Sequence, residues 1–207
     1  MAKAFIVGVG PGDPGWLTDR ARLAIHSEAV LGWELNLVPL AGLLEGKTLF
    51  VQKPDNYRAV AHQAASAMWE SNGTIAIVRI GDALVSSGLS DLLACFQDFQ
   101  IEVIPGISPV QLTAALARFN LDEAVAVSFH EERRWEEEQR FMYDVFQRGR
   151  HLINLTGLHQ HPNEAAPYLI AQGVDSQTEA LVNECLTLPD ERIIHGTLGE
   201  IALLYFH

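Results

Sequence analysis

The chain of 207 residues has little cysteine and no long hydrophobic run. Cys95 and Cys185 are too few and too isolated for a disulfide framework or a paired-cysteine metal site, so we expect each to be a small buried apolar side chain. No apolar run approaches the roughly 20 residues that a membrane helix needs, and residues 1–6 lack the features of a signal peptide. These absences favour a cytoplasmic protein with no membrane partner.

Positive charge is also scarce, with 14 Lys and Arg residues against 26 Asp and Glu residues and a net charge of -12. Such a surface repels polyanions at long range, so we expect no nucleic-acid partner. The same field opposes a small polycarboxylate ligand, which would need a local basic patch. The hydrophobic content of 48% is enough for one large or two small domains.

Apolar runs of strand length alternate with helical patterns along the whole chain. Runs such as TIAIVRI are apolar on both faces, as in a parallel sheet covered by helices, and we predict an α/β fold with two α/β domains, residues 1–107 and 108–207. Thr18 and Ser108 are placed to cap the first and fourth helices. The predicted strands are 4–9, 48–51, 74–80, 101–104, 124–129, 151–155, 178–182 and 192–195. The predicted helices are 18–25, 56–69, 88–96, 109–117, 134–148, 163–171 and 197–204.

The stretch VGVGPGDPG, residues 7–15, combines four glycines, two prolines and the carboxylate of Asp13. A glycine-rich turn after an apolar strand favours close approach of the backbone to a ligand. The dinucleotide fingerprint fails here, because Asp13 stands at the third glycine and Pro11 lacks an amide proton. A carboxylate suits a cationic or neutral ligand better than a pyrophosphate. A purely structural turn with a solvated Asp13 is the alternative.

Three further turns follow predicted strands, at residues 80–83, 105–108 and 154–158. Ligands of open α/β sheets bind outside the carboxyl ends of strands, so these turns are expected to converge on one pocket between the domains. Taken alone, each turn could equally have only a structural role and no ligand, for example as an Asx-turn at Asp82. The segment GKT at 46–48 is not a P-loop, because it lacks the required earlier glycine and the preceding strand.

Together these turns resemble the tetrapyrrole methylases, which transfer methyl groups from S-adenosylmethionine (SAM) to porphyrinoid rings. The family pattern GxGPGDPxxLT is matched by residues 8–18, and its PGI[ST] turn by residues 105–108. The Gly-Asp-Pro loop is matched at 81–82, with Ala83 in place of proline and Ser87 in place of a later glycine. The resemblance covers essentially the whole chain. It implies a SAM-binding cleft between two domains, a homodimer and no metal.

Within the family, three segments resemble the branch that methylates C5 of cobalt-precorrin-7 in cobalamin biosynthesis. They are EVIPGISPVQL from Glu102, AVAVSFH ending at His130 and PDERIIHGTL from Pro189. Some relatives are fused to a second methylase that decarboxylates and methylates C15, and here we expect that step in a separate partner protein. Relatives commonly carry Gly-Arg after the histidine, where this chain has residues 131–134, EERR. The alternatives are another acceptor, as in diphthine synthase or a ribosomal RNA 2'-O-methyltransferase, or a noncatalytic tetrapyrrole-binding relative.

The resemblance implies the SAM contacts named at the end of this paragraph, whereas His130 is chosen for its place at a strand end and Arg133 and Arg134 for the positive charge that an acidic ligand needs. His130 is the candidate catalytic acid, base or hydrogen-bond donor. Arg133 and Arg134 are candidates for binding ring carboxylates, unless the charge run simply forms a solvated helix face, and Asp13 is a further candidate substrate contact. We attribute His159 and His161 to a loop and not to a metal site. The predicted SAM contacts are Pro11, Ile80, Gly81, Asp82, Val85, Ser108, Pro109, Thr156 and Leu186.

The chemistry needs little from acids and bases. The sulfonium of SAM is a strong electrophile and a corrinoid enamine carbon is already nucleophilic. We therefore expect the protein mainly to align donor and acceptor, which can lower a barrier by roughly 7 to 11 kcal/mol.

Overall fold

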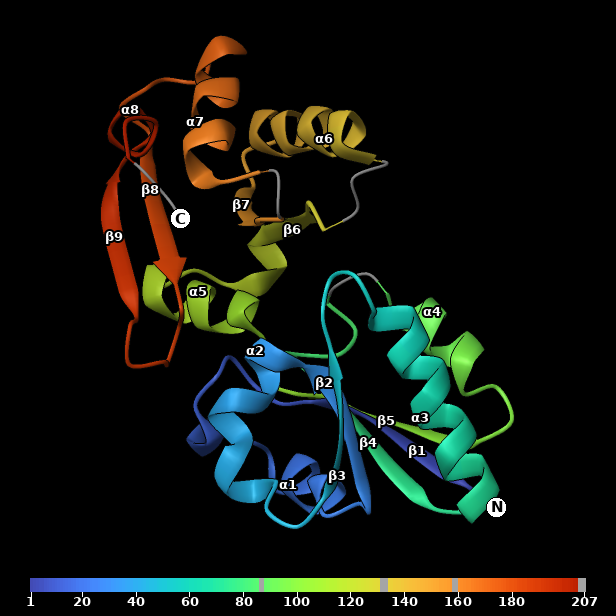
Figure 1. Cartoon of the computed structure of the whole chain (residues 1–207). Helices are drawn as coiled ribbons and strands as arrows, with labels where there is room; N and C mark the ends of the chain where they lie inside the picture. Colours follow the sequence, from blue (N-terminus) through green and yellow to red (C-terminus); the bar gives the residue numbers. More distant parts are fainter. Residues whose placement is uncertain (86–87, 131–133, 158–159, 205–207) are drawn as a thin grey trace. The chain divides into compact units, whose positions relative to one another are not determined.

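The computed structural model describes residues 1–85, 88–130, 134–157 and 160–204, and it divides into two compact units, Met1–Pro109 and Val110–His207 (Figure 1). The units divide after Pro109, two residues beyond the domain boundary predicted after residue 107. Three residues discussed above, Ser87, Arg133 and His159, lie outside the described residues.

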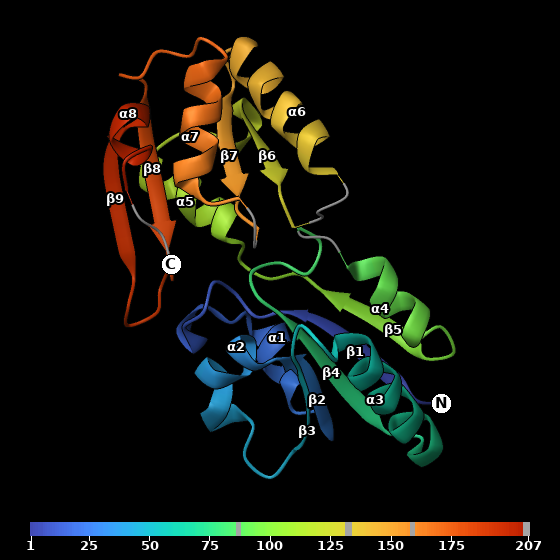
Figure 2. The same cartoon turned by 45° about the horizontal axis from the view of Figure 1, so that its top comes forward.

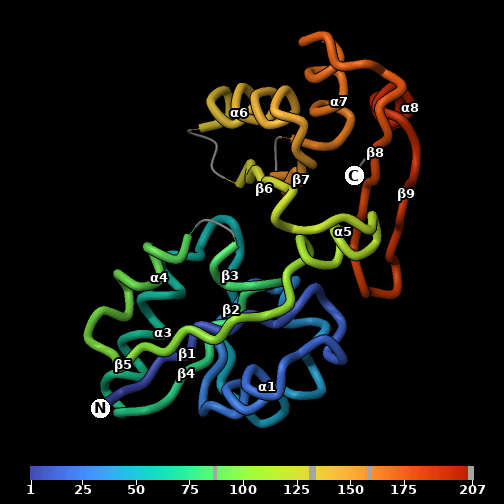
Figure 3. Tube along the Cα trace, turned by 180° about the vertical axis from the view of Figure 1, so that it is seen from behind, coloured from blue at the N-terminus to red at the C-terminus, as the bar shows by residue number. Residues whose placement is uncertain are grey.

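Unit 1 is built on a five-stranded parallel sheet in the order β3-β2-β4-β1-β5. The chain enters this sheet at β1, which lies between β4 and β5 (Figure 3). The central strand β4 contains four successive buried apolar residues, as expected for a strand covered on both faces. The strands are β1 (Lys3–Gly8), β2 (Ala29–Trp33), β3 (Thr48–Gln52), β4 (Thr74–Arg79) and β5 (Gln100–Ile104).

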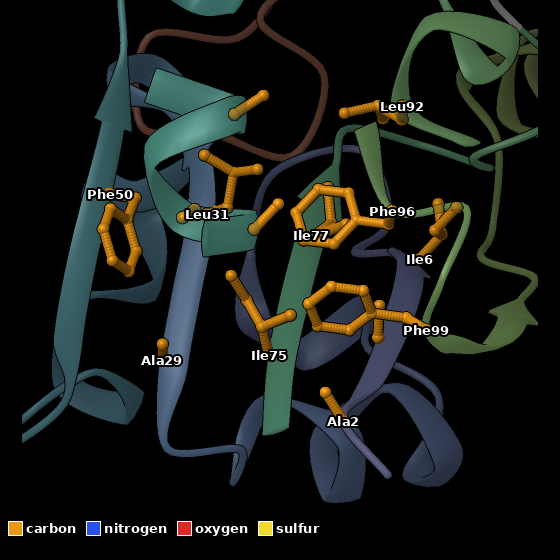
Figure 4. Close-up of a cluster of buried hydrophobic side chains, with 14 of the residues drawn as sticks. Ala2, Ile6, Ala29, Leu31, Phe50, Ile75, Ile77, Leu92, Phe96 and Phe99 are labelled. Carbon is orange, nitrogen blue, oxygen red and sulfur yellow. The ribbon is translucent and has the colours of Figure 1, made fainter. Parts of the chain in front are cut away.

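Helices cover both faces of this sheet. The helices are α1 (Asp19–Ile25), α2 (Glu34–Leu37), the 3-10 helix η2 (Val38–Leu43), α3 (Tyr57–Ser71) and α4 (Leu89–Cys95). Ile75 and Ile77 pack in one buried cluster with α3 and α4, whereas Ala76 and Val78 pack in another with α1, α2 and η2. This is the alternation of a strand between two layers. Figure 4 shows the first cluster, where Phe96 and Phe99 lie over Ile77 and Ile75.

The strand β2 and the helices α2 and η2 were not predicted. The sequence of β2, AVLGW, is short, and a glycine inside a strand pattern weakens it. The structure explains Gly32: a Cβ at this position would lie 2.5 Å from Cγ2 of Val78 on the neighbouring strand β4. Close packing between β2 and β4 therefore requires a glycine at position 32. The same glycine weakens the strand pattern of the sequence, which is why β2 was not predicted.

Unit 2 contains two small sheets. Strands β6 (Ala124–Ser128) and β7 (His151–Leu155) are parallel, whereas β8 (Glu179–Glu184) and β9 (Arg192–Thr197) are antiparallel. The helices are α5 (Pro109–Ala117), which begins at the unit boundary, α6 (Trp135–Gln147), α7 (Pro162–Ala171) and α8 (Leu198–Ile201). Side chains of β6, α6, α7, β8 and α8 share one buried core. Figure 2 shows how these elements are arranged in unit 2.

The remaining short elements are the 3-10 helices η1 (Pro14–Trp16) and η3 (Leu121–Glu123). The Thr18 cap is confirmed, since its Oγ1 accepts a hydrogen bond from Ala21 N at 3.1 Å.

Two predictions are wrong. The last helix ends at Ile201 and not at residue 204, and Cys185 is exposed because it lies in the connection between β8 and β9, while Cys95 is only half-buried.

Candidate functional site

Two of the predicted turns meet at the carboxyl ends of the neighbouring strands β1 and β4. Gly10 N donates to Gly81 O at 3.1 Å, and Gly81 N donates to Gly10 O at 2.6 Å. The φ angles are +77° at Gly10 and +67° at Gly81, a region that residues with a Cβ rarely adopt. The two glycines therefore make a short bridge that joins the first glycine turn to the IGDA turn.

The turn after β5 closes against the same bridge. A Cβ on Gly106 would lie 2.3 Å from Gly81 O and 2.6 Å from the carbonyl carbon of Gly8, and a Cβ on Gly8 would lie 2.6 Å from Gly106 N. We call residues 8–11, 80–82 and 105–108 the three-turn cluster. Its strands β4, β1 and β5 are consecutive in the sheet. The glycines thus allow backbone to pack on backbone, a role the sequence analysis did not assign to them.

The carboxylate of Asp82 organises this cluster. Its Oδ1 accepts from Leu84 N at 2.7 Å, which makes an Asx-turn, and its Oδ2 accepts from Gly106 N at 3.0 Å. The side chain is half-buried, and it ties the turn after β4 to the turn after β5. Asp82 therefore has a positioning role within the chain, and the SAM contact assigned to it stays a prediction.

Asp13, the carboxylate of the opening turn, also has a local partner. Its Oδ1 accepts from Gly15 N at 2.5 Å and caps the 3-10 helix η1. Arg22 supports the same turn by donating from Nη2 to Pro14 O at 2.9 Å. This geometry matches the structural interpretation of Asp13, and its predicted contact with substrate stays a prediction.

Exposed apolar side chains surround the turn after β4. Ile80, Leu84 and Val85 are 48%, 57% and 38% exposed, whereas Ala83, at the position of the family's proline, is completely buried. Apolar groups gathered at a strand end suit an apolar part of a ligand. The other predicted SAM contacts of unit 1 lie in or next to the cluster: Pro11 and Ser108 are buried, and Pro109 Cδ lies 2.6 Å from the Cβ position of Gly81.

In unit 2, His130 and Thr156 follow the adjacent parallel strands β6 and β7. His130 is exposed, and its Nδ1 lies 2.9 Å from Ser128 Oγ. Gly157 packs tightly against the preceding turn, since a Cβ there would lie 2.1 Å from Phe129 O. The candidate catalytic histidine therefore lies at a strand end with its imidazole oriented by a hydroxyl.

A tryptophan–glutamine pair, which the sequence analysis missed, lies beside this turn. Trp135 Nε1, at the start of α6, donates to Gln160 Oε1. Because an indole nitrogen can only donate, this bond fixes which end of the Gln160 amide is oxygen. Gln160 is 1% exposed, and its Nε2 has no hydrogen-bond partner among the described residues. No sequence motif marks either residue.

Arg134 lies at the amino end of α6 among acidic side chains. It pairs with Glu137 and Glu138, each at 3.4 Å. This is the arrangement of a charged helix face, in which much of the positive charge is balanced locally. The substrate role predicted for Arg134 stays a prediction, and Arg133 lies outside the described part of the chain.

Leu186, the last predicted SAM contact, lies in a strained connection between β8 and β9. It is buried, and its neighbours Cys185 and Thr187 have φ angles of +48° and +68°. A positive φ is rare for a β-branched residue such as Thr187. Thr187 N donates to Glu191 Oε2 at 2.6 Å, which helps to hold this conformation. Strain of this kind clusters at functional sites in proteins.

His161 takes part in the start of the helix α7. Its backbone N donates to Glu164 Oε2 at 2.9 Å at the beginning of α7. Within the described ranges, no group of three or more His, Cys, Asp and Glu side chains is placed to hold a metal ion. No helix in those ranges is long and apolar enough to cross a membrane.

Comparison with known families decides what this arrangement belongs to. The sequence model of the tetrapyrrole (corrin/porphyrin) methylases matches residues 3–202. The chain is a member of this family. Tetrapyrrole methylases are SAM-dependent methyltransferases, so the methyl donor predicted from the sequence is the donor of the family.

Individual relatives of this tetrapyrrole methylase agree with the family and the fold. A probable cobalt-precorrin-7 C(5)-methyltransferase from Methanocaldococcus jannaschii is 29% identical over 206 residues, covering 96% of this chain and 90% of the relative. The structure of precorrin-6Y methylase from Archaeoglobus fulgidus has a TM-score of 0.69 at 24% identity, covering 98% and 92% of the two chains. Uroporphyrin-III C-methyltransferase from Thermus thermophilus, complexed with S-adenosylhomocysteine (SAH), has a TM-score of 0.73 at 23% identity, covering 97% and 85%.

Proposed function

We propose that this tetrapyrrole methylase transfers a methyl group from SAM to C5 of cobalt-precorrin-7, a corrinoid intermediate of cobalamin biosynthesis. The observation that carries the proposal is the similarity, over 96% of this chain and 90% of the relative, to the probable cobalt-precorrin-7 C(5)-methyltransferase of M. jannaschii. The three-turn cluster adds support, because it gathers strand-end backbone at the position where α/β sheets bind ligands.

The residues of unit 1 fit SAM chemically. Exposed Ile80, Leu84 and Val85 offer apolar contacts for the adenosyl group, and the turns offer backbone amides and carbonyls. The turns contain carboxylates and no close set of cations, which suits a positively charged sulfonium better than a phosphate. When bound, SAM supplies an electrophilic methyl group. The protein's part is to hold this group in line with the acceptor carbon.

His130 is the residue that we propose to manage the proton. Replacing hydrogen with methyl on a ring carbon forms a C–C bond, breaks the S–CH3 bond and releases one proton. The hydrogen bond between Nδ1 and Ser128 Oγ orients the imidazole, so that Nε2 is the atom that exchanges a proton with the substrate. Thr156, at the neighbouring strand end, and Leu186 are proposed to complete the donor site.

The proposal is tested by incubating the purified chain with SAM and cobalt-precorrin-7 and measuring product masses. We expect a gain of one methyl unit with an equal amount of SAH. Separate reactions with ribosomal RNA and with elongation factor 2 that carries the 3-amino-3-carboxypropyl-histidine precursor of diphthine test the other acceptors of this fold. Methylation of either one, or SAH binding without turnover of any corrinoid, would contradict the proposed acceptor.

We also propose a homodimer and a separate enzyme for the C15 step, both implied by the family resemblance. Light scattering of the purified chain is expected to give twice the mass of 22.8 kDa. A monomer at micromolar concentration would refute the first of these proposals.

A further inference from the structure

Trp135, the first residue of α6, has a large part of its indole in solvent. The residue is 42% exposed, and the described residues that make up the buried apolar cluster of unit 2 do not include it. The indole is held at its edge instead, where Nε1 donates a hydrogen bond to Gln160 Oε1. An N–H bond lies in the plane of the ring, so this contact uses the edge of the indole and leaves its faces for stacking.

Gln160 has the properties of a residue that positions another. Its side chain is 1% exposed, its Oε1 accepts from the indole, and its Nε2 has no hydrogen-bond partner among the described residues. Burial of an amide donor without a partner costs stability, and an apolar side chain of the same size would avoid that cost. Such a side chain would not hold the indole nitrogen, and holding it is what Gln160 contributes.

The pair lies next to the turn that carries His130. A Cβ on Gly157 would lie 2.1 Å from Phe129 O and 3.4 Å from His130 N, so Gly157 packs directly on that turn. Gln160 forms an antiparallel bridge with Gly157 and donates from its backbone N to Gly157 O at 3.5 Å. Continuous contacts within unit 2 therefore link the fixed indole to the histidine that we propose to take up the proton.

We infer that the indole of Trp135 stacks on the conjugated face of the tetrapyrrole, and that Gln160 fixes the indole in the orientation this contact needs. The inference rests on the proposed function. A macrocycle is far wider than an imidazole, so a ring whose C5 reaches His130 must also cover the surface beside it. Offset stacking between conjugated rings adds to the energy of burying them. An indole that is already oriented loses little freedom when the ring binds.

The first test removes the aromatic face. Binding of cobyrinic acid, a stable corrin, is measured by titration in the presence of SAH for wild type, Trp135→Phe and Trp135→Leu. We expect Trp135→Leu to weaken corrin binding about tenfold, and Trp135→Phe, which keeps a smaller face, to weaken it less. Phe141→Leu is the matched control and should leave corrin affinity unchanged. Phe141 is a similarly exposed aromatic residue of α6, at 46%, and lies on a different face of the helix.

The second test asks whether Gln160 acts through the indole. Gln160→Met keeps the indole but frees its edge, so corrin binding should weaken about threefold. In a chain that already carries Trp135→Leu, the same substitution should have no further effect on corrin binding. A role of Gln160 in the fold alone would weaken corrin binding by the same factor in both backgrounds, which would overturn its positioning role.

The outcomes separate this inference from the proposed function. Unchanged corrin affinity in Trp135→Leu, or an equal loss in Phe141→Leu, would overturn the stacking role and leave the acceptor class intact. If Trp135→Leu does not fold, wild-type corrin affinity in both Trp135→Phe and Gln160→Met would overturn it. SAH affinity should equal that of wild type in every variant, and a joint loss of SAH and corrin binding would also count against stacking. A wild-type chain that binds SAH but no corrin would overturn the acceptor class and this inference together.

Discussion

The two units satisfy their polar groups to different degrees. Among the described residues, the buried side-chain atoms without a hydrogen-bond partner are Asn154 Oδ1, Gln160 Nε2 and Asn183 Oδ1, all in unit 2. Unit 2 also holds three of the four non-glycine residues with positive φ that the structure describes: Arg118, Cys185 and Thr187. The fourth, Asn72, caps the carboxyl end of α3 in unit 1, where a left-handed residue is usual.

Unmet hydrogen bonds and strained backbone are rare in native proteins and call for an explanation. Unit 1 instead has glycines that let its strand-end turns pack backbone on backbone. We interpret unit 1 as a rigid frame that holds its strand-end turns together. Within the described residues, unit 2 holds the buried unsatisfied side-chain atoms and most of the strained backbone.

The largest expected effect comes from filling the three-turn cluster. Gly106→Ala places a methyl group 2.3 Å from Gly81 O, so either backbone or sheet must shift. We expect a loss of about 3 kcal/mol in the free energy of unfolding, or failure to fold, measured by urea denaturation. Gly42→Ala is the matched control, because a Cβ there meets nothing within 4 Å. Equal stability of the two variants would show that the cluster is not rigid.

A smaller effect is expected from cutting the tether of the cluster. Asp82→Ala leaves Leu84 N and Gly106 N without their acceptor, which should cost about 1 to 3 kcal/mol. Calorimetry should also show weaker SAH binding, since the turn that carries Ile80 and Val85 loses its anchor. Asp91→Ala, which breaks only an exposed ion pair with Arg58, serves as control. Unchanged stability and SAH affinity would remove Asp82 from the donor site.

Substitution of the buried Gln160 in unit 2 should change stability much less than substitution of Asp82 in unit 1. Gln160→Met removes, at similar volume, an amide whose Nε2 has no hydrogen-bond partner among the described residues, and the half-exposed Trp135 can turn its indole nitrogen to water. We expect a change of less than about 1 kcal/mol in either direction, followed by thermal melting. A loss as large as that of Asp82→Ala would contradict the contrast drawn between the units.

The smallest effect concerns an exposed ion-pair group on β5. Hydrogen bonds from Arg20 and Lys3 hold the pKa of Glu102 below its ordinary value of 4.5. The charged form is thus favoured in the folded state, so its contribution to stability is present above pH 4.5 and is lost as the pH falls through the lower folded pKa. The difference in melting temperature between wild type and Glu102→Gln should be small at about pH 7 and should shrink further as the pH is lowered below 4.5. A difference in melting temperature that grows as the pH falls would mean that the pKa of Glu102 is raised and not lowered by folding.

The sequence predicted those features that depend on local pattern. The strand β4 was predicted because its short apolar run is typical of a strand that is covered on both faces, and the turns were found by their glycines. The strand β2 was missed because Gly32 interrupts its apolar pattern. Only the structure shows that the close contact with Val78 requires a glycine there. Trp135 and Gln160 could not be paired from sequence, since only the fold of unit 2 brings them together. Exposure of Cys185 likewise depends on how β8 and β9 are connected.

The central claim, that this tetrapyrrole methylase alkylates C5 of a corrinoid with SAM, is tested most directly by following the methyl group itself. The chain is incubated with cobalt-precorrin-7 and SAM labelled with carbon-13 in its methyl group, and the product is examined by NMR spectroscopy. The account predicts a single labelled methyl resonance coupled to C5, formed together with SAH. A label on another ring carbon, or SAH binding without any labelled corrinoid, would contradict it.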